Sequence, residues 1–309
     1  MIQTVVSTLI HVIVPLSIPV TAGALLGRFR NWDTKPLLTL YLYFLSPAIL
    51  FDTMATAEIS YDDVYKTIAF SFLNLFLLWL TAGILGRLLK LEPAEASGLI
   101  LVSTFTNSVN YGLPLVLLAF GQLGLDKASV YVIGQMVIVN TIGVYFAARS
   151  QFSVKNALKS VFALPAIYAA LLAFLLRMLH VQVPAEIASG VAMAAGAYSP
   201  VVLAVLGAQM VKVRSSHTHS RLKSAFWTGI AVRLILAPFI AGLGLFLLHI
   251  TGTLFSVLLI LACMPVAVNA VVLAERFDAS PEFVSRCILW TTMASFIVLP
   301  ILIVLVNHA

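Results

Sequence analysis

Charged residues are scarce in this sequence. They make up 10% of the chain, whereas hydrophobic residues make up 61% and the mean hydropathy is +1.06. Soluble domains carry about 25% charged residues, so the composition excludes a soluble globular protein. Cysteine is almost absent too, and Cys263 and Cys287 both lie inside apolar segments. This placement favours packing positions over a disulfide or a cysteine-based metal site.

The sequence also lacks the short motifs of common catalytic sites. It contains no phosphate-binding glycine loop, no zinc-protease helix motif and no nucleophile motif. We therefore expect neither an enzyme nor a resident cofactor or metal. ATP-driven transport would require a separate subunit.

What is present instead is a series of long apolar runs. Each has about 20 residues or more, the length that crosses a hydrocarbon core about 30 Å thick, and continuous runs argue against a β-barrel. Ten runs are recognisable, at residues 4–27, 36–55, 64–88, 94–120, 128–149, 156–179, 185–211, 222–249, 251–276 and 282–307. The sequence thus predicts an all-α polytopic membrane protein with ten transmembrane helices in the lipid bilayer.

The positive charges mark one side of the membrane. Lysine and arginine cluster near residues 28–35, 87–90, 149–159, 212–223 and 276–286, whereas the other side holds only Lys66, Lys127 and Arg177. Because basic loops stay in the cytoplasm, we expect a multi-pass cell-membrane protein with both termini outside. The net charge of +6 is then a topology signal and requires no nucleic acid partner.

Three pairs of segments recur in the same order in the two halves of the chain. LSPAIL at 45–50 resembles YSPVVL at 198–203, residues 14–29 resemble 163–178, and SVNYGLPL at 108–115 resembles AVNAVVLA at 267–274. We infer a five-helix repeat at 1–150, a cytoplasmic linker at 151–155 and a second five-helix repeat at 156–309. Because five is odd, the second repeat is inverted in the membrane. Inverted repeats are typical of secondary transporters.

The fourth and ninth runs are interrupted at corresponding places, residues 107–114 and 263–269. Pro114 and Pro265 lack a backbone N–H, and Gly112 permits dihedral angles closed to other residues, so we expect both helices to break there. The half-helices then present N–H groups that suit an anion. The alternative is an ordinary proline kink, but two matched breaks favour a binding site.

Polar residues inside the apolar runs are the candidate site residues. Asn107, Asn110 and Asn269 flank the breaks and supply amides without a buried charge. Arg233 lies deep in the eighth run and is either an anion contact or gating residue, or reaches toward the inner face. Asp52 in the second run is either a proton-coupling carboxylate or a residue of the outer interface.

Four segments resemble the auxin efflux carrier family: TNSVNYGLPL (106–115), PVVLAVLGAQM (200–210), MPVAVNAVVLAERF (264–277) and TTMASFIVLP (291–300). That family includes bacterial malate and malonate permease-like proteins and the plant auxin exporters. The resemblance implies that the fourth and ninth helices cross. It also implies a scaffold of helices 1, 2, 6 and 7, a moving transport domain of helices 3–5 and 8–10, and a homodimer.

The resemblance adds candidate residues in the fifth run. Gln135, Asn140 and Tyr145 resemble the fifth helix of the plant exporters, although Asn140 stands where those proteins have a second glutamine. The expected function is a secondary carrier that moves small organic anions, such as carboxylates, by elevator-type alternating access. A sodium-coupled carrier resembling bile acid symporters, and a non-transporting sensor or channel, are the alternatives. The break regions contain no carboxylate, which argues against a sodium site.

Overall fold

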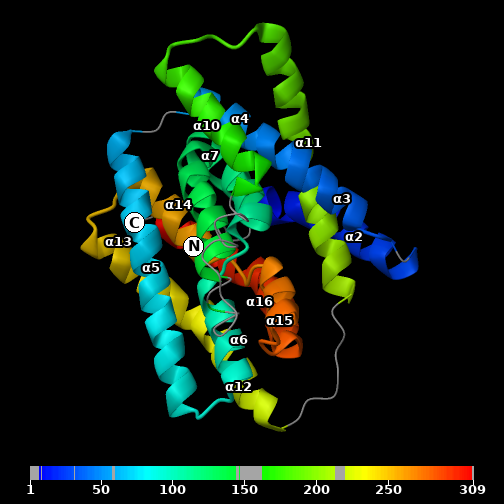
Figure 1. The fold of residues 1–309 in the computed structure, drawn as a ribbon, viewed down its shortest axis with the longest axis vertical. Coiled ribbons are helices and arrows are strands. Elements are labelled where there is room, and N and C mark those ends of the chain that lie inside the picture. Colours follow the sequence, from blue (N-terminus) through cyan, green and yellow to red (C-terminus); the bar gives the residue numbers. More distant parts are fainter. Residues whose placement is uncertain are drawn as a thin grey trace.

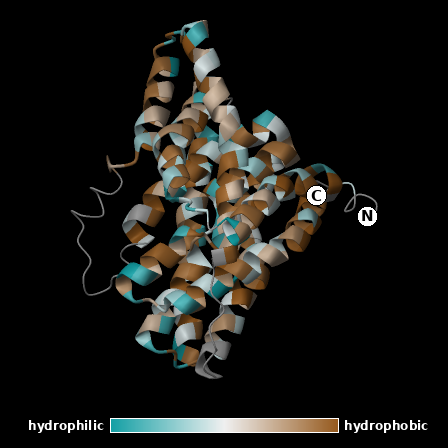
Figure 2. Cartoon of the chain, turned by 90° about the vertical axis from the view of Figure 1, so that its right-hand side faces the viewer, coloured by the Kyte–Doolittle hydropathy of each residue, from teal (hydrophilic) through white to brown (hydrophobic). Residues whose placement is uncertain are grey.

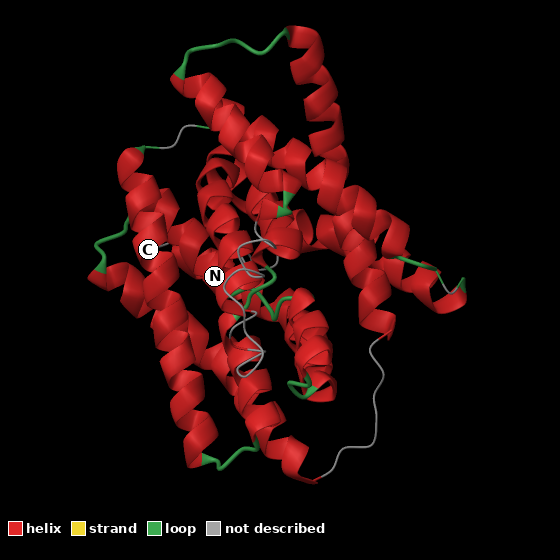
Figure 3. Ribbon diagram, viewed as in Figure 1, coloured by secondary structure: helices red, strands yellow, loops and turns green. Residues whose placement is uncertain are grey.

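The computed structural model describes residues 9–30, 32–57, 60–143, 162–212 and 220–307, together with Ser7 and Phe146. These residues form helices joined by short connections, and none of them belongs to a strand (Figure 3). The predicted all-α fold is confirmed.

Helices occupy the described part of each of the ten apolar runs. In chain order, with η for a π-helical turn, they are η1 (Leu9–Ile13), α2 (Val14–Phe29), α3 (Lys35–Leu40), η2 (Tyr41–Leu45), α4 (Ser46–Thr56), α5 (Tyr61–Leu88), α6 (Pro93–Thr104), η3 (Ser108–Gly112), α7 (Leu113–Ile138), η4 (Val139–Gly143), α10 (Pro165–Met178), α11 (Ala185–Lys212), α12 (Ser220–Ala231), η5 (Val232–Leu236), α13 (Ala237–Leu247), α14 (Gly252–Ala262), α15 (Asn269–Phe277) and α16 (Pro281–Asn307).

Seven helical segments of the described chain are long and apolar enough to cross a membrane, by length and composition. Seven is fewer than the ten predicted transmembrane helices partly because two runs are broken. The fourth run is divided into α6 and η3–α7, and the ninth into α14 and α15. In addition, α7 turns at Gly121, where φ of 66° and ψ of −160° form a conformation that only glycine adopts readily. The part of α7 before Gly121 thus belongs to the fourth run and the part after it to the fifth, although Ser108–Gly143 counts as one of the seven segments. Ten crossings remain a prediction.

Four of the π-helical turns share a position relative to proline. η1, η2, η3 and η5 each end two residues before a proline, namely Pro15, Pro47, Pro114 and Pro238. A proline ring within a helix clashes with the carbonyl one turn earlier and removes an N–H donor. A wider π turn accommodates that ring and leaves a backbone carbonyl without its usual donor. The prolines thus determine where these helices widen.

The helices pack as two groups (Figure 1). The first helix group contains α2, η2, α4, α10 and α11. In it, α2 packs on α11, and η2 and α4 pack on both α10 and α11. The second helix group contains α5, α6, α7, α12, α13, α14, α15 and α16, which pack on one another. Hydrophobic residues are spread along all the helices and polar ones are sparse (Figure 2), as expected for a chain surrounded by lipid.

Two glycines allow the backbones of α2 and α11 to touch. A Cβ atom added to Gly23 would lie 1.8 Å from the carbonyl oxygen of Ala204, and one added to Gly207 would lie 1.9 Å from the carbonyl oxygen of Val20. Small residues let membrane helices approach closely, which replaces the hydrophobic effect as a source of packing energy. These two positions therefore have no room for any side chain.

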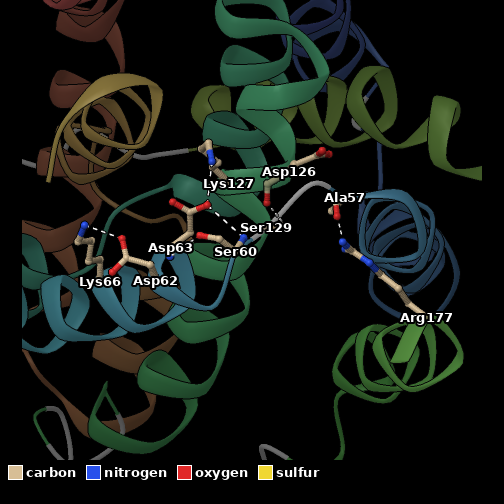
Figure 4. Close-up of polar contacts among 9 residues, drawn as sticks. All are labelled: Ala57, Ser60, Asp62, Asp63, Lys66, Asp126, Lys127, Ser129 and Arg177. Carbon is tan, nitrogen blue, oxygen red and sulfur yellow. Dashed lines mark hydrogen bonds and ion pairs between the residues drawn. The ribbon is translucent and has the colours of Figure 1, made fainter. Parts of the chain in front are cut away.

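The three basic residues assigned to the outer side all contact the start of α5 or the residues just before it (Figure 4). Arg177 of α10 donates a hydrogen bond to the carbonyl oxygen of Ala57, and Lys127 of α7 pairs with Asp63 at 2.9 Å. Lys66 forms an ion pair within α5. Ala57, just after α4, is thus held to α10, and Asp63, at the start of α5, is held to α7.

Candidate functional site

The two helix breaks pair with each other through their backbones. The N–H of Asn107 donates to the carbonyl oxygen of Pro265 at 2.8 Å, and the N–H of Ala267 donates to that of Phe105 at 2.9 Å. Between them, Thr106 and Val266 form an isolated antiparallel bridge. Unpaired backbone groups are costly in a membrane interior. Each break therefore supplies the hydrogen-bonding partners that the other needs.

The first break lies earlier than the prolines and glycines predicted. α6 ends at Thr104 and η3 begins at Ser108, so the non-helical residues are 105–107 and not 107–114. Pro114 lies in the first turn of α7, where a proline is tolerated. Gly112 has ordinary helical angles, φ −67° and ψ −46°. A Cβ atom at Gly112 would lie 2.7 Å from Cδ2 of Leu261, the end of a side chain that can move aside.

A cavity of about 240 Å³ lies against the paired breaks. It brings together four of the residues singled out from the sequence, Asn107, Asn110, Gln135 and Asn269. The full lining is Tyr41, Leu42, Thr106, Asn107, Val109, Asn110, Gln135, Met136, Val139, Leu164, Ala267, Val268 and Asn269. Gly112, Pro114 and Pro265, which were also singled out from the sequence, are not part of this lining.

Two amide atoms at this cavity have no protein partner within the described part of the chain. They are Nδ2 of Asn107 and Oδ1 of Asn110, both buried. Asn269 begins α15 and Asn107 precedes η3, so both stand at the N-terminal ends of helices. Those ends carry partial positive charge. The cavity thus offers amide groups and helix ends to a polar or anionic ligand.

Arg233 was expected either to contact an anion or act in gating, or to reach toward the inner face, and its observed contacts are different. It is fully buried (0% exposed) and donates to the carbonyl oxygen of Ser103 at 2.8 Å and to that of Ala262. These carbonyls lie at the C-terminal ends of α6 and α14, where partial negative charge accumulates. Arg233 therefore holds the two half-helices that lead into the breaks. It neither lines the cavity nor reaches an aqueous face.

A second cavity of about 710 Å³ adjoins the first. Tyr41, Leu42, Val268 and Asn269 line both of them. The larger cavity extends between the two helix groups, along α11 and the C-terminal part of α15, to Glu275 and to the start of α16. The basic clusters near residues 212–223 and 276–286 flank these same ends of α11, α15 and α16.

Three further predicted residues have different outcomes. Asp52 lies half-buried on α4 and is not among the residues that line either cavity. Tyr145 lies outside the described residues, as does the side chain of Asn140 in η4.

Sequence reasoning missed the two tyrosines that the first helix group contributes next to the breaks. Tyr41 lines both cavities, and Tyr198 donates a hydrogen bond to the carbonyl oxygen of Val109 at 3.1 Å. The repeat gave no signal for them, because Tyr198 stands two residues before Pro200 whereas Tyr41 stands six residues before Pro47, so the two are not at equivalent positions.

Comparison with known proteins places the chain among transporters. The family described as membrane transport protein matches residues 4–159 and 150–303. An uncharacterized transporter of Methanothermobacter thermautotrophicus is 26% identical over 301 residues, covering 97% of this chain and 96% of the relative. An uncharacterized transporter of Methanocaldococcus jannaschii is 27% identical over 289 residues, covering 88% and 90%. The chain belongs to the membrane transport protein family, that of the auxin efflux carriers.

Proposed function

We propose that this protein is a secondary transporter that moves small organic anions, such as carboxylates, across the cell membrane by elevator-type alternating access. The observation that carries the proposal is the cavity of about 240 Å³ at the paired breaks. Amide side chains from both halves of the chain, Asn110 and Asn269, line it together with Asn107 and Gln135.

The chemistry of this cavity suits a carboxylate that must be released again. Amide N–H groups donate to carboxylate oxygens, and hydrogen bonds to a charged partner are worth about 1.5–3 kcal/mol each. The N-terminal ends of η3 and α15 add partial positive charge without a fixed cation. The cationic side chain of Arg233 already donates to carbonyl oxygens at the C-terminal ends of α6 and α14, just before the breaks. Binding through dipoles rather than through a buried ion pair favours release on either side.

The packing of the helices supports the proposed division into a scaffold and a moving domain. In the numbering of the apolar runs, the first helix group corresponds to helices 1, 2, 6 and 7, and the second to helices 3–5 and 8–10. The contacts α2–α11 and α4–α10 join helix 1 to helix 7 and helix 2 to helix 6. In an inverted repeat, helix 1 corresponds to helix 6 and helix 2 to helix 7. The contact between helices 1 and 7 then corresponds to the contact between helices 6 and 2, as expected for two halves related by a two-fold axis.

The proposed orientation has both termini outside. Lys66, Lys127 and Arg177 gather around the start of α5, as residues of one membrane face should. We further propose that the protein forms a homodimer through the first helix group. We also propose that transport is coupled to protons, with Asp52 as the carboxylate that carries the proton.

The experiment that tests the proposed function is a binding measurement on the purified protein. A panel of mono- and dicarboxylates, with and without sodium and at two pH values, should contain at least one ligand that binds with saturation. Binding that requires sodium would favour the sodium-coupled alternative. A panel in which no carboxylate binds under any condition would contradict the proposal.

A further inference from the structure

A groove of about 330 Å³ lies between the last turns of α5 and the first turns of α6. These helices lie side by side, and the turn that joins them is at the end of the molecule where α12 begins (Figure 1). The groove shares no lining residue with the two cavities described above. Its lining is Trp79, Leu80, Ala82, Gly83, Ile84, Gly86, Arg87, Lys90, Leu91, Pro93, Ala96 and Ile100.

Glycines of α5 leave room for the apolar part of this groove. A Cβ atom added to Gly83 would meet nothing within 4 Å, so the groove is open there. At Gly86 the same atom would lie 3.6 Å from Cβ of Ala96, which keeps α5 and α6 in contact next to the opening. The exposed side chains of Leu80 and Ile84 lie within one helical turn of Gly83. This part of the groove suits a hydrocarbon chain.

The groove also contains two cations at the turn between the helices. Arg87 and Lys90 are exposed, and neither forms an ion pair or a side-chain hydrogen bond with the described part of the chain. No carboxylate is among the described residues that line the groove. Glu92 and Glu95 follow in the sequence but lie outside the lining, and Glu95 accepts from the N–H of Glu92 at 3.2 Å. The two cations are therefore available to an anion.

The backbone of the turn does not itself require a lysine. Lys90 has a φ of 51°, a left-handed conformation that glycine adopts at lower energy. The N–H of Leu91 donates to the carbonyl oxygen of Gly86 at 3.0 Å, which ends the helix in the manner that usually uses glycine at the position of Lys90. A glycine at this position would thus keep the turn and remove only the cation.

We propose that this groove binds an anionic phospholipid of the cytoplasmic leaflet, with the phosphate at Arg87 and Lys90 and an acyl chain along Gly83 toward Trp79. The order of groups matches such a lipid. The cations stand at the end of α5, in a basic cluster assigned to the cytoplasmic side, and Trp79 lies eight residues earlier, about 12 Å deeper along the helix. The site is independent of the transported ligand and takes only its membrane orientation from the proposed topology.

The test is lipid binding by the purified full chain in detergent, measured by native mass spectrometry during titration with phosphatidylglycerol or zwitterionic phosphatidylcholine. The parent should bind phosphatidylglycerol more tightly. Each basic residue near an anionic lipid contributes about fivefold in affinity, so Arg87→Met/Lys90→Gly should bind about 30-fold more weakly. The matched control is Arg28→Met/Arg30→Met, which removes two exposed cations at the same membrane side and should bind as the parent does.

A further variant separates a seated lipid from general attraction of charge. Gly83→Leu keeps both cations and fills the open part of the groove without a clash. It should bind phosphatidylglycerol at least about fivefold more weakly, while its Tm in lipid-free detergent stays at the parental value or above, because leucine favours a helix more than glycine does. Lys90→Gly should likewise keep the lipid-free Tm and lose affinity.

Several results would overturn the lipid site. They are equal affinity of the parent for the two lipids, an equal loss in the Arg28/Arg30 control, and parental binding by Gly83→Leu. Inorganic phosphate that raises the Tm of the parent as much as phosphatidylglycerol does would show a soluble anion instead. A smaller oligomeric mass of Gly83→Leu by light scattering would show that a second copy of the chain fills the groove.

Discussion

The backbone N–H of Asn107 donates to the carbonyl oxygen of Pro265 at 2.8 Å, so the broken fourth run is tied directly to the broken ninth. This contact brings two segments far apart in the sequence to one point. Because each break satisfies the other's backbone, neither half of the site can form without its counterpart. The cavity at the breaks is therefore a property of the whole chain.

The role assigned to Arg233 predicts a loss of stability on its removal. Arg233→Met leaves the carbonyl oxygens of Ser103 and Ala262 without their donor, at about 1–3 kcal/mol for each buried group. Thermal unfolding in detergent should show a clearly lowered Tm. Arg87→Met is the matched control, because Arg87 is exposed near the end of α5 and its replacement should change stability by less than about 0.5 kcal/mol. Equal Tm values for the two variants would contradict the role of Arg233.

The contact between α2 and α11 predicts that one glycine of α11 is irreplaceable and another is not. In Gly207→Ala, the new Cβ would lie 1.9 Å from the carbonyl oxygen of Val20, so the helices must separate. Overpacking of this kind costs about 1–3 kcal/mol or more. In Gly190→Ala, on the same helix, the Cβ meets nothing within 4 Å. Gly190→Ala should keep the parental unfolding temperature, and a similar loss in both variants would refute the contact.

The proposed orientation predicts which residues an impermeant thiol reagent reaches. A cysteine at position 62 should be labelled in intact cells, because the side chain of Asp62 is 64% exposed at the end assigned to the outside. A cysteine at position 217 should react only after the cells are permeabilised. The two native cysteines are buried and should give little background. Labelling of position 217 in intact cells would invert the proposed topology.

Composition and residue order predict much of this fold but only part of the site. The described parts of the apolar runs are mostly helical outside the two breaks, because a segment in lipid needs its backbone satisfied within itself. The asparagines of the two breaks were visible as polar residues in apolar surroundings. The sequence pattern misplaced the first break, because pairing between Asn107 and Pro265 decides where α6 ends, and that contact is tertiary.

The roles of three further residues depend on contacts that no local pattern contains. Arg233 looks like an isolated charge in the sequence, yet its partners are carbonyls at the ends of two distant helices. Tyr41 and Tyr198 look like ordinary apolar-run aromatics, and only the packing of α11 and η2 against η3 brings them to the site.

Asn110 and Asn269 are the residues proposed to bind the transported anion. Alanine at either position removes one hydrogen-bonding partner of a carboxylate, which should cost about 1.5–3 kcal/mol of binding, or about 10- to 150-fold in affinity. A packing asparagine in a membrane protein contributes only about 0.6 kcal/mol on average. Asn74→Ala is the matched control, since Asn74 is a buried amide on α5 that lines neither cavity.

The decisive measurement is the affinity of the purified protein for its best carboxylate, with each variant first shown to keep the parental unfolding temperature without ligand. Asn110→Ala and Asn269→Ala should each bind at least about tenfold more weakly than the parent, and Asn74→Ala should bind as the parent does. If both of the first two variants bind within about twofold of the parent, the anion site lies elsewhere and Asn110 and Asn269 do not bind the ligand.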